Sequence, residues 1–439
     1  MGYTLGIDLG STTTKAILLD ANDRIVGRGL TNTRSNYEVA TAVAESEAKI
    51  NAHFTFLKEA VDSSPKLSSQ AAPLLNNLEN RFHLVQHLHR VNRLRRQCLF
   101  EAAADRLLPH QPRLTTVLNA LFDQIHERAE RSFSTADVDR SRFFRDIVGS
   151  EYMALAEEQS RESSIALDLL MGLYDKSILV EENQVLDLSF VEAIQQAVEA
   201  AGESETLTRV QQKALREVVE EAASQTLEVD NMVGTGYGRQ RLPFRKDQIR
   251  SEILCHGLGA HYFFPGTRTV LDIGGQDTKA IQVDSQGIVT SFQMNDRCAA
   301  GCGRYLGYIA DELNLGLHQL GPLALQAKRP VRITSTCTVF AGAELRERLS
   351  MGDAREDILD GLHRAIILRA MSLLARSGGI TDEFTFTGGV AKNPAAVRAL
   401  TRLVEENYGT MKINIHPDSI FTGAVGAALY ARHTQGGIA

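Results

Sequence analysis

Two stretches of the chain repeat one arrangement of an aspartate, a glycine-containing turn and a lysine. They read IDLGSTTTKA at residues 7–16 and LDIGGQDTKA at residues 271–280. In each copy the aspartate ends an apolar run typical of a strand, and glycine lets the turn bring backbone N–H groups close to an anion. Either copy alone also fits an ordinary β-hairpin. Two copies in register, followed by a third glycine-rich element, predict a pair of phosphate-binding turns.

The side chains of the two turns suit a metal-bound phosphate. Asp8 and Asp272, one from each copy, are expected to hold Mg²⁺ mainly through its water molecules, and Lys15 adds a positive charge. The remaining phosphate contacts predicted from the turns are small residues and one amide, namely Gly10, Ser11, Thr12, Thr13, Gly274, Gly275 and Gln276.

The third element reads FTFTGGVAKNP at residues 384–394, a strand that runs into paired glycines and then a helix start at Asn393-Pro394. Gly388 and Gly389 would let adenosine approach the backbone, and Asn393 is a further candidate contact. The later segment TGAVGAAL, residues 422–429, predicts a helix with a small-residue face beside this pocket. Plain helix packing would also explain that face.

Hydrolysis of ATP in such a site needs a polar side chain that orients water toward the γ-phosphate. Gln276, Asp272 and Glu252 are the candidates. For Glu252 a place on a helix surface remains an alternative, and Asp277 could serve only to brace its turn.

The order of these three elements resembles that of the acetate and sugar kinase, Hsp70 and actin superfamily. The resemblance implies an α/β actin-like fold, in which two duplicated ribonuclease H-like domains surround a cleft for ATP or ADP. Residues 51–228 contain only three of the 34 glycines, and their apolar residues recur at helical spacing, so we expect a large all-helical insertion. The N-terminal actin-like domain is predicted in two parts, residues 1–48 and residues 229–268, which the insertion at 49–228 separates. The C-terminal actin-like domain is predicted at 269–439, and it contains Cys298 and Cys337, which are discussed below as cluster ligands.

Composition narrows the class of partner. The 439 residues carry a formal charge of -7, which disfavours nucleic acid as the main partner and does not favour a membrane surface. The N-terminal sequence MGYTLGIDLG shows no secretory signal, so we expect a cytoplasmic protein.

An odd number of cysteines without such a signal argues for thiols or metal ligands rather than disulfides; they are Cys98, Cys255, Cys298, Cys302 and Cys337.

Two cysteines lie where a loop is expected to enter a helix. They are Cys298 in MNDRCAAGCGRYL, residues 294–306, and Cys337 in STCTVFA, residues 335–341. A helix N-terminus stabilises an anionic thiolate. A [4Fe-4S] cluster usually takes four thiolates, so a pair of subunits that each contribute Cys298 and Cys337 would complete one. Two ordinary buried cysteines are the alternative.

These segments, with VGTGYGR at 233–239 and SEILCH at 251–256, resemble the BadF/BadG/BcrA/BcrD-type ATPases over residues 1 to about 45 and 229–439. That family comprises ATPase subunits of benzoyl-CoA reductase and activators of 2-hydroxyacyl-CoA dehydratases. The resemblance implies that Cys298 and Cys337 ligate a [4Fe-4S] cluster shared between two subunits. Cys302, four residues after Cys298, is a possible third ligand.

By the same resemblance, ferredoxin reduces the cluster, and ATP hydrolysis accompanies electron transfer to catalytic acyl-CoA-binding subunits. The long insertion favours the larger ATPase subunit of benzoyl-CoA reductase, which serves dearomatisation in anaerobic aromatic degradation, paired with a smaller homologous ATPase subunit. The alternatives are a dehydratase activator, a small-molecule kinase of the same fold, and a nucleotide-gated binding module like Hsp70.

Within the insertion, two clusters invite a functional interpretation. His83, His87 and His89 with Cys98 suggest a metal site, although solvated histidines are the expected alternative. A basic stripe could dock an acidic ferredoxin or a partner subunit, although a solvated helix face would look the same; its residues are Arg90, Arg93, Arg95 and Arg96.

Overall fold

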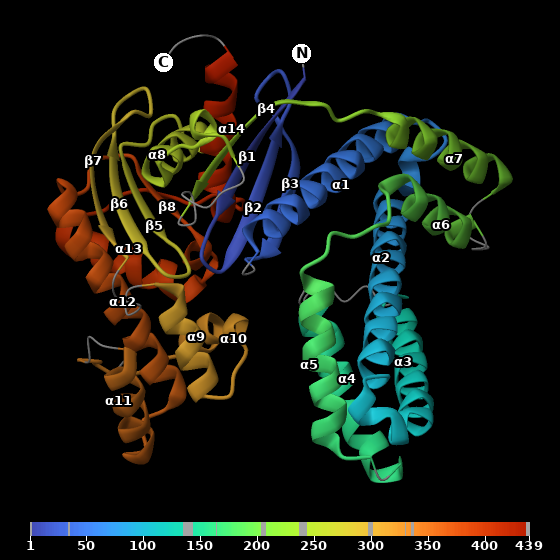
Figure 1. Cartoon of the computed structure of the whole chain (residues 1–439). Helices are drawn as coiled ribbons and strands as arrows, with labels where there is room; N and C mark the ends of the chain where they lie inside the picture. Colours follow the sequence, from blue (N-terminus) through green and yellow to red (C-terminus); the bar gives the residue numbers. More distant parts are fainter. Residues whose placement is uncertain are drawn as a thin grey trace. The chain divides into compact units, whose positions relative to one another are not determined.

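The chain folds into two compact units in a computed structural model, shown in Figure 1. One unit combines Met1–Thr33 with Glu228–Ala439, and the other is Arg34–Leu227. The structure describes residues 2–33, 36–134, 144–163, 165–202, 208–236, 244–296, 302–329, 331–334 and 338–435.

The first sheet of the split unit has the strand order β3-β2-β1-β4. Its strands are β1 (Tyr3–Leu9), β2 (Thr13–Leu19), β3 (Ile25–Asn32) and β4 (Val229–Gly236). The first three strands pair antiparallel, whereas β4, which follows the helical unit in sequence, pairs parallel with β1. Six of the seven residues of β1 are buried, as expected for a central strand covered on both faces.

The second sheet repeats this plan in the order β7-β6-β5-β8-β9. Its strands are β5 (Thr269–Ile273), β6 (Thr278–Val283), β7 (Val289–Asn295), β8 (Phe384–Thr387) and β9 (Ile413–Asn414). Again the hairpin strands β5, β6 and β7 are antiparallel, and β8 joins β5 in parallel. The duplication expected from the two Asp-Gly-Lys segments is therefore present in the topology of both sheets.

Helices connect and cover the two sheets of this unit. The α-helices are α8 (Glu252–Phe263), α9 (Gly303–Glu312), α10 (Leu317–Ala324), α11 (Thr338–Ser350), α12 (Arg355–Ser377), α13 (Pro394–Tyr408) and α14 (Thr422–Gln435). Short 3-10 turns are η4 (Lys246–Gln248), η6 (Gly389–Lys392) and η7 (Ser419–Phe421). Helix α12 packs on β6 and β7 and helps to form the largest apolar core, which also takes in α9, α10 and α13.

Helix α14 carries the small-residue face expected from TGAVGAAL, and it packs against β1, β4 and α8. The α8 contact is so close that a Cβ added at Gly426 would collide with the backbone carbonyl of Cys255. The small face thus lets α8 approach α14, and Glu252 at the start of α8 is held close to the ends of the strands.

The second unit consists of helices. They are α1 (Tyr37–Ser63), α2 (Ala71–Ala102), α3 (Gln111–Ser134), α4 (Phe144–Ser163), α5 (Leu167–Glu182), α6 (Phe190–Gly202) and α7 (Arg209–Ser224), with 3-10 turns η1 (Ser68–Gln70) and η2 (Asp105–His110). Helix α2 joins two apolar cores, one around Phe82 with α1, α6 and α7, the other around Phe122 and Tyr152 with α3, α4 and α5. In Figure 1, α2 and α3 run side by side, in agreement with their contacts.

The helical unit starts before the expected residue 49. Residue 49 lies within α1, which begins at Tyr37 behind the N-cap Asn36, whose side chain accepts the N–H groups of Glu38 and Val39. The predicted boundary at 48/49 therefore falls inside a continuous helix, and the helical unit is Arg34–Leu227. The further division of the split unit at 268/269 stays a prediction.

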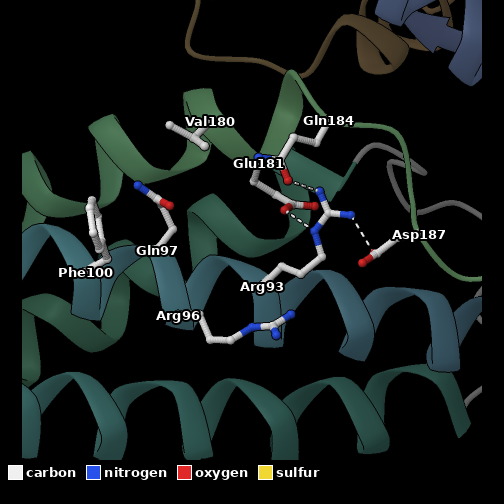
Figure 2. A pocket seen from close by; sticks show the side chains of 8 residues that line it. All are labelled: Arg93, Arg96, Gln97, Phe100, Val180, Glu181, Gln184 and Asp187. Atoms are coloured by element: carbon white, nitrogen blue, oxygen red, sulfur yellow. Dashed lines mark hydrogen bonds and ion pairs between the residues drawn. The ribbon is translucent and has the colours of Figure 1, made fainter.

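Three of the four arginines of the suggested basic stripe, Arg90, Arg93 and Arg95, pair with carboxylates, while Arg96 lines the same pocket as Arg93. Figure 2 shows Arg93 surrounded by Glu181, Gln184 and Asp187 at a pocket of about 380 Å³. Its Nε donates to Glu181 Oε2 over 2.9 Å and its Nη1 to Asp187 Oδ1 over 2.8 Å. Arg90 also pairs with Glu181, and Arg95 pairs with Asp123. A spacing of three residues turns Arg90 and Arg93 toward α5, where carboxylates neutralise them.

The histidines of α2 are not grouped as metal ligands. His89 pairs with Asp187 over 2.8 Å. His87 is buried between the rings of Phe133 and Phe144, and burial lowers its pKa to about 4. Within the described residues, no group of three or more His, Cys, Asp or Glu side chains could hold a metal ion.

Across the described parts of the chain, no helix is both long and apolar enough to cross a bilayer.

The close contact between α8 and α14 predicts a large effect for Gly426→Ala. The added methyl must displace backbone, so we expect the free energy of unfolding to fall by more than about 2 kcal/mol in urea titrations. Gly307→Ala in α9 is the matched control, because nothing lies within 4 Å of the added Cβ and alanine favours the helix by about 0.5–1 kcal/mol. Equal stabilities of the two variants would contradict the proposed packing.

Candidate nucleotide site

The first turn joins β1 to β2 and places Asp8 opposite Lys15. Lys15 Nζ lies 3.3 Å from Asp8 Oδ2, and both side chains are largely buried. The turn is closed by the N–H of Gly10, which donates to the carbonyl of Thr13 over 3.2 Å, and by Thr33 Oγ1, which donates to the carbonyl of Gly10 over 2.6 Å. Ser11 and Thr13 are half-buried and Thr12 is exposed at this turn.

The second turn repeats this geometry between β5 and β6. Lys279 Nζ lies 3.3 Å from Asp272 Oδ2, the same distance as in the first copy, and 2.7 Å from Asp277 Oδ2. The N–H of Gly274 donates to the carbonyl of Asp277 over 2.9 Å. Asp277 therefore braces the turn, the role considered for it above, while the neighbouring Gln276 is half-buried.

The two turns meet. A Cβ added at Gly275 of the second turn would collide with the side chain of Thr12 of the first. Glycine at this position thus allows the two turns to approach closely enough to act on one phosphate chain. This juxtaposition of residues far apart in sequence is what the repeat predicts for a nucleotide cleft.

The charge of Asp272 is fixed by its surroundings. Burial by itself raises the pKa of this carboxyl, but the adjacent His256 and Lys279 outweigh burial and lower that pKa to about 2. Thr387 Oγ1 at the end of β8 also donates to Asp272 Oδ1 over 3.0 Å. For Lys279, burial disfavours the ammonium, yet the carboxylates of Asp272 and Asp277 raise its pKa above the usual value. Asp272 is therefore ionised at neutral pH, as a metal-facing carboxylate must be.

Glu252 lies at the first turn of α8 and is buried, not on a helix surface. Burial raises the pKa of its carboxyl, while Lys279 opposes the shift; Asp277, His256 and Asp8 are further charged groups within its reach. A raised carboxyl pKa suits a group that accepts a proton from water. Of the candidates for orienting water, Glu252 is thus within electrostatic range of Asp8 and of Lys279, the lysine that pairs with Asp272.

The element that the sequence predicts to receive adenosine follows β8. Gly388 lies beside Ile273 and Asp272, and the space above Gly389 is open, with nothing within 4 Å of an added Cβ. Asn393 has a different task in the structure: its Oδ1 caps α13 by accepting the N–H groups of Ala395 and Ala396, and its Nδ2 donates to His363 Nε2 over 3.0 Å. A nucleotide contact through Asn393 stays a prediction.

Cys298 and Cys337 lie outside the described residues, so their role stays a prediction. The described neighbours are informative. Cys302 is buried at the N-cap of α9. The next two N–H groups, of Gly303 and Arg304, donate to the carbonyls of Gly274 and Gly275 over 2.8 and 2.7 Å. Helix α9, which follows the first cysteine segment, is therefore hydrogen-bonded directly to the turn between β5 and β6, the second of the two predicted phosphate-binding turns.

Three residues that lie around Asp272 were not identified from the sequence as part of the nucleotide site. Lys279 is the counterpart of Lys15 in the repeat, so the alignment of the copies could have identified it. Thr387 directly precedes the paired glycines. His256 stands one helical turn after Glu252 in SEILCH, but only the crossing of α8 over β5 shows that it reaches Asp272.

Removal of Lys279 should cost more stability than removal of Lys15. Lys279→Ala leaves Asp272 and Asp277 without their shared buried cation, and we expect a loss of about 3–5 kcal/mol in the free energy of unfolding. Lys15→Ala is the matched variant, because Lys15 pairs with one carboxylate and is partly exposed. Urea titrations of both variants at pH 7 test this, and an equal or larger loss for Lys15→Ala would contradict the assignment.

Comparisons with known proteins agree with this geometry. The sequence matches the BadF/BadG/BcrA/BcrD ATPase family over residues 5–431. It is 42% identical over 219 residues to the (R)-2-hydroxyglutaryl-CoA dehydratase activating ATPase of Acidaminococcus fermentans, covering 50% of this chain and 82% of that relative. One of the benzoyl-CoA reductase subunits of Thauera aromatica is 32% identical over 229 residues, covering 52% and 80%.

A solved structure extends the similarity to the fold. The crystal structure of the Acidaminococcus fermentans (R)-2-hydroxyglutaryl-CoA dehydratase component A aligns with a TM-score of 0.56 at 25% identity, covering 99% of this chain and 100% of the other. The chain therefore has the actin-like ATPase fold, with a large helical insertion, and it belongs to the BadF/BadG/BcrA/BcrD ATPase family.

Proposed function

We propose that this chain hydrolyses Mg·ATP and thereby activates a partner enzyme of the 2-hydroxyacyl-CoA dehydratase type. The observation that carries the proposal is the pair of matching Asp–Lys turns, Asp8–Lys15 and Asp272–Lys279, which converge through Thr12 and Gly275. The family and its activator ATPases supply the biological context.

Each part of the site has a task in this proposal. Asp8 and Asp272 accept hydrogen bonds from the waters of Mg²⁺, and Lys15 faces the phosphates. Backbone N–H groups of both turns surround the phosphate oxygens, with hydroxyls from Ser11, Thr12 and Thr13. Glu252 or Gln276 orients the attacking water toward the γ-phosphate, while the backbone at Gly388 and Gly389 accommodates adenosine.

The proposal extends to electron transfer through a [4Fe-4S] cluster held by Cys298 and Cys337, with two chains supplying four thiolates. The described neighbours support this part of the proposal, because Thr338, directly after Cys337, begins α11, and Cys302, four residues after Cys298, occupies the N-cap position of α9. These two helices contact each other where Gly342 faces Tyr308. When bound, the cluster would supply one-electron chemistry at low potential.

The hydrogen bonds from α9 to the second turn suggest how the two halves of the function communicate. A nucleotide-dependent shift of Gly274 and Gly275 would pull on the N–H groups of Gly303 and Arg304. The cysteine segment immediately before α9 would then move with the turn.

The partner is the finer part of the proposal. The 42% identity to a dehydratase-activating ATPase, against 32% to the benzoyl-CoA reductase relative, favours the activator role over the reductase role expected from the insertion. In the reductase alternative the chain would pair with a smaller homologous ATPase subunit and pass electrons from ferredoxin to acyl-CoA-binding subunits. A small-molecule kinase would need neither cysteine.

Glu252→Gln tests the hydrolytic site. A residue that orients water acts mainly in the transition state, so we expect kcat for ATP to fall by about 100-fold with little change in KM. Phosphate release by the purified chain gives both constants. Gln276→Ala is the companion variant; wild-type kcat in Glu252→Gln together with a loss in Gln276→Ala would transfer the role to Gln276.

Cys298→Ser and Cys337→Ser test the cluster. Anaerobically purified wild type should contain iron and sulfide and give an EPR signal after reduction by dithionite, and each variant should lose both. Cys98→Ser is the matched control, because Cys98 is buried in the helical unit and burial raises its pKa to about 12. Wild type without iron, or variants that keep it, would contradict the cluster, while Cys302→Ser shows whether a third thiolate contributes.

A further inference from the structure

His256 is a buried side chain next to Asp272, one of the two carboxylates that we propose to face Mg²⁺. It lies on α8 one turn after Glu252, is 6% exposed, and its Nδ1 is 3.3 Å from Asp272 Oδ1. Its other ring nitrogen faces the opposite sheet: a point 2.8 Å from His256 Nε2, the Cβ position that Gly423 lacks, is also 3.1 Å from Asp8 Oδ2. The imidazole is thus close to Asp272, and its Nε2 edge borders the same small space, beside Gly423, that Asp8 borders from the other half of the duplicated fold.

The surroundings of His256 differ from those of a histidine that only fills a core. His363 is such a residue, since its Nδ1 donates to the carbonyl of Leu359 over 2.7 Å and its Nε2 accepts from Asn393 Nδ2 over 3.0 Å. His256 Nδ1 is buried, close to Asp272, and has no hydrogen bond in good geometry to any described residue.

The neighbours of His256 belong to the site. Asp272 accepts from Thr387 on Oδ1 and pairs with Lys279 on Oδ2, and the imidazole is the third polar group beside this carboxylate. Glu252 on the same helix is electrostatically coupled to His256, Lys279, Asp277 and Asp8. On the side of α14, the backbone at Gly423 leaves room for both the imidazole and Asp8.

We infer that His256 is a positioning residue of the ATPase site: its Nδ1, 3.3 Å from Asp272 Oδ1, and its Nε2 edge, which borders the space beside Asp8, orient both carboxylates toward one Mg·nucleotide. The inference rests on the proposed ATPase function. It concerns orientation of metal-facing groups, for which replacement of the supporting partner commonly costs roughly 10- to 100-fold in metal affinity or activity.

The test measures Mg²⁺ dependence as well as turnover. For the full chain, calorimetry gives the affinity for the non-hydrolysable analogue AMPPNP at several Mg²⁺ concentrations, and phosphate release gives kcat and KM. We expect His256→Ala to raise the half-saturating Mg²⁺ concentration and lower kcat, each by about 10-fold or more, with affinity in EDTA unchanged. His261→Asn on the same helix is the matched control and should behave as wild type.

Two conservative variants separate the ring nitrogens. Asparagine places an amide N–H near the position of Nδ1 and glutamine near that of Nε2, so His256→Asn should recover more Mg²⁺ affinity than His256→Gln. Gly423→Ala keeps the imidazole but crowds Nε2 and Asp8, and it should reproduce part of the His256→Ala defect.

Wild-type Mg²⁺ dependence in His256→Ala would overturn the inference, and so would equal defects in the alanine and asparagine variants accompanied by equal losses in Tm, which indicate packing alone. Absence of ATP hydrolysis in wild type would instead refute the proposed function, and the Mg²⁺ titration with AMPPNP would still decide the role of His256.

Discussion

The burial of charge at the strand ends constrains the rest of the ATPase unit. Asp8 and Asp272 are almost fully buried, and an isolated carboxylate in such surroundings would be strongly destabilising. Each is compensated by the lysine directly across its hairpin, which requires the strand register that pairs Asp8 with Lys15 and Asp272 with Lys279. A slip of one residue would turn the lysine to the opposite face of the sheet and leave the carboxylate unpaired. The same ion pairs that stabilise the hairpins therefore fix the position of the two carboxylates that we propose to face Mg²⁺.

The candidate site also depends on close packing between helices α8 and α14. Helix α8 supplies Glu252 and His256, and it reaches the aspartates because its backbone approaches α14 at Gly426. A bulkier residue there would separate the helices and withdraw both side chains from the cluster. The small-residue face of α14 is thus both a packing feature, as the plain alternative held, and a requirement of the site.

The parts of the site that could be predicted from the sequence are those encoded locally and repeated. The Asp-Gly-Lys segments led to the expectation of two hairpins, and the structure brings Thr12 and Gly275 together as the repeat implied. The role of His256 could not be predicted, because it depends on how α8 crosses the second sheet.

The arginines of α2 misled for a related reason: their spacing shows which face they share, but not that Glu181 and Asp187 lie opposite that face. The start of the helical unit was misplaced because Tyr37–Ser63 contains glycine-free, alanine-rich sequence that differs little across residue 49.

The two copies have diverged in a way that assigns different tasks to their lysines. Lys279 is 3% exposed and forms ion pairs with both Asp272 and Asp277, so two carboxylates neutralise its charge. Lys15 has one carboxylate partner and a side chain that is 12% exposed, and it lies near Gly10 at the turn. A phosphate can therefore compete for Lys15 at a lower electrostatic cost than for Lys279. The duplication supplies two similar turns, and the additional carboxylate at Asp277 makes Lys279 structural, whereas Lys15 keeps the exposure that its proposed contact with a nucleotide requires.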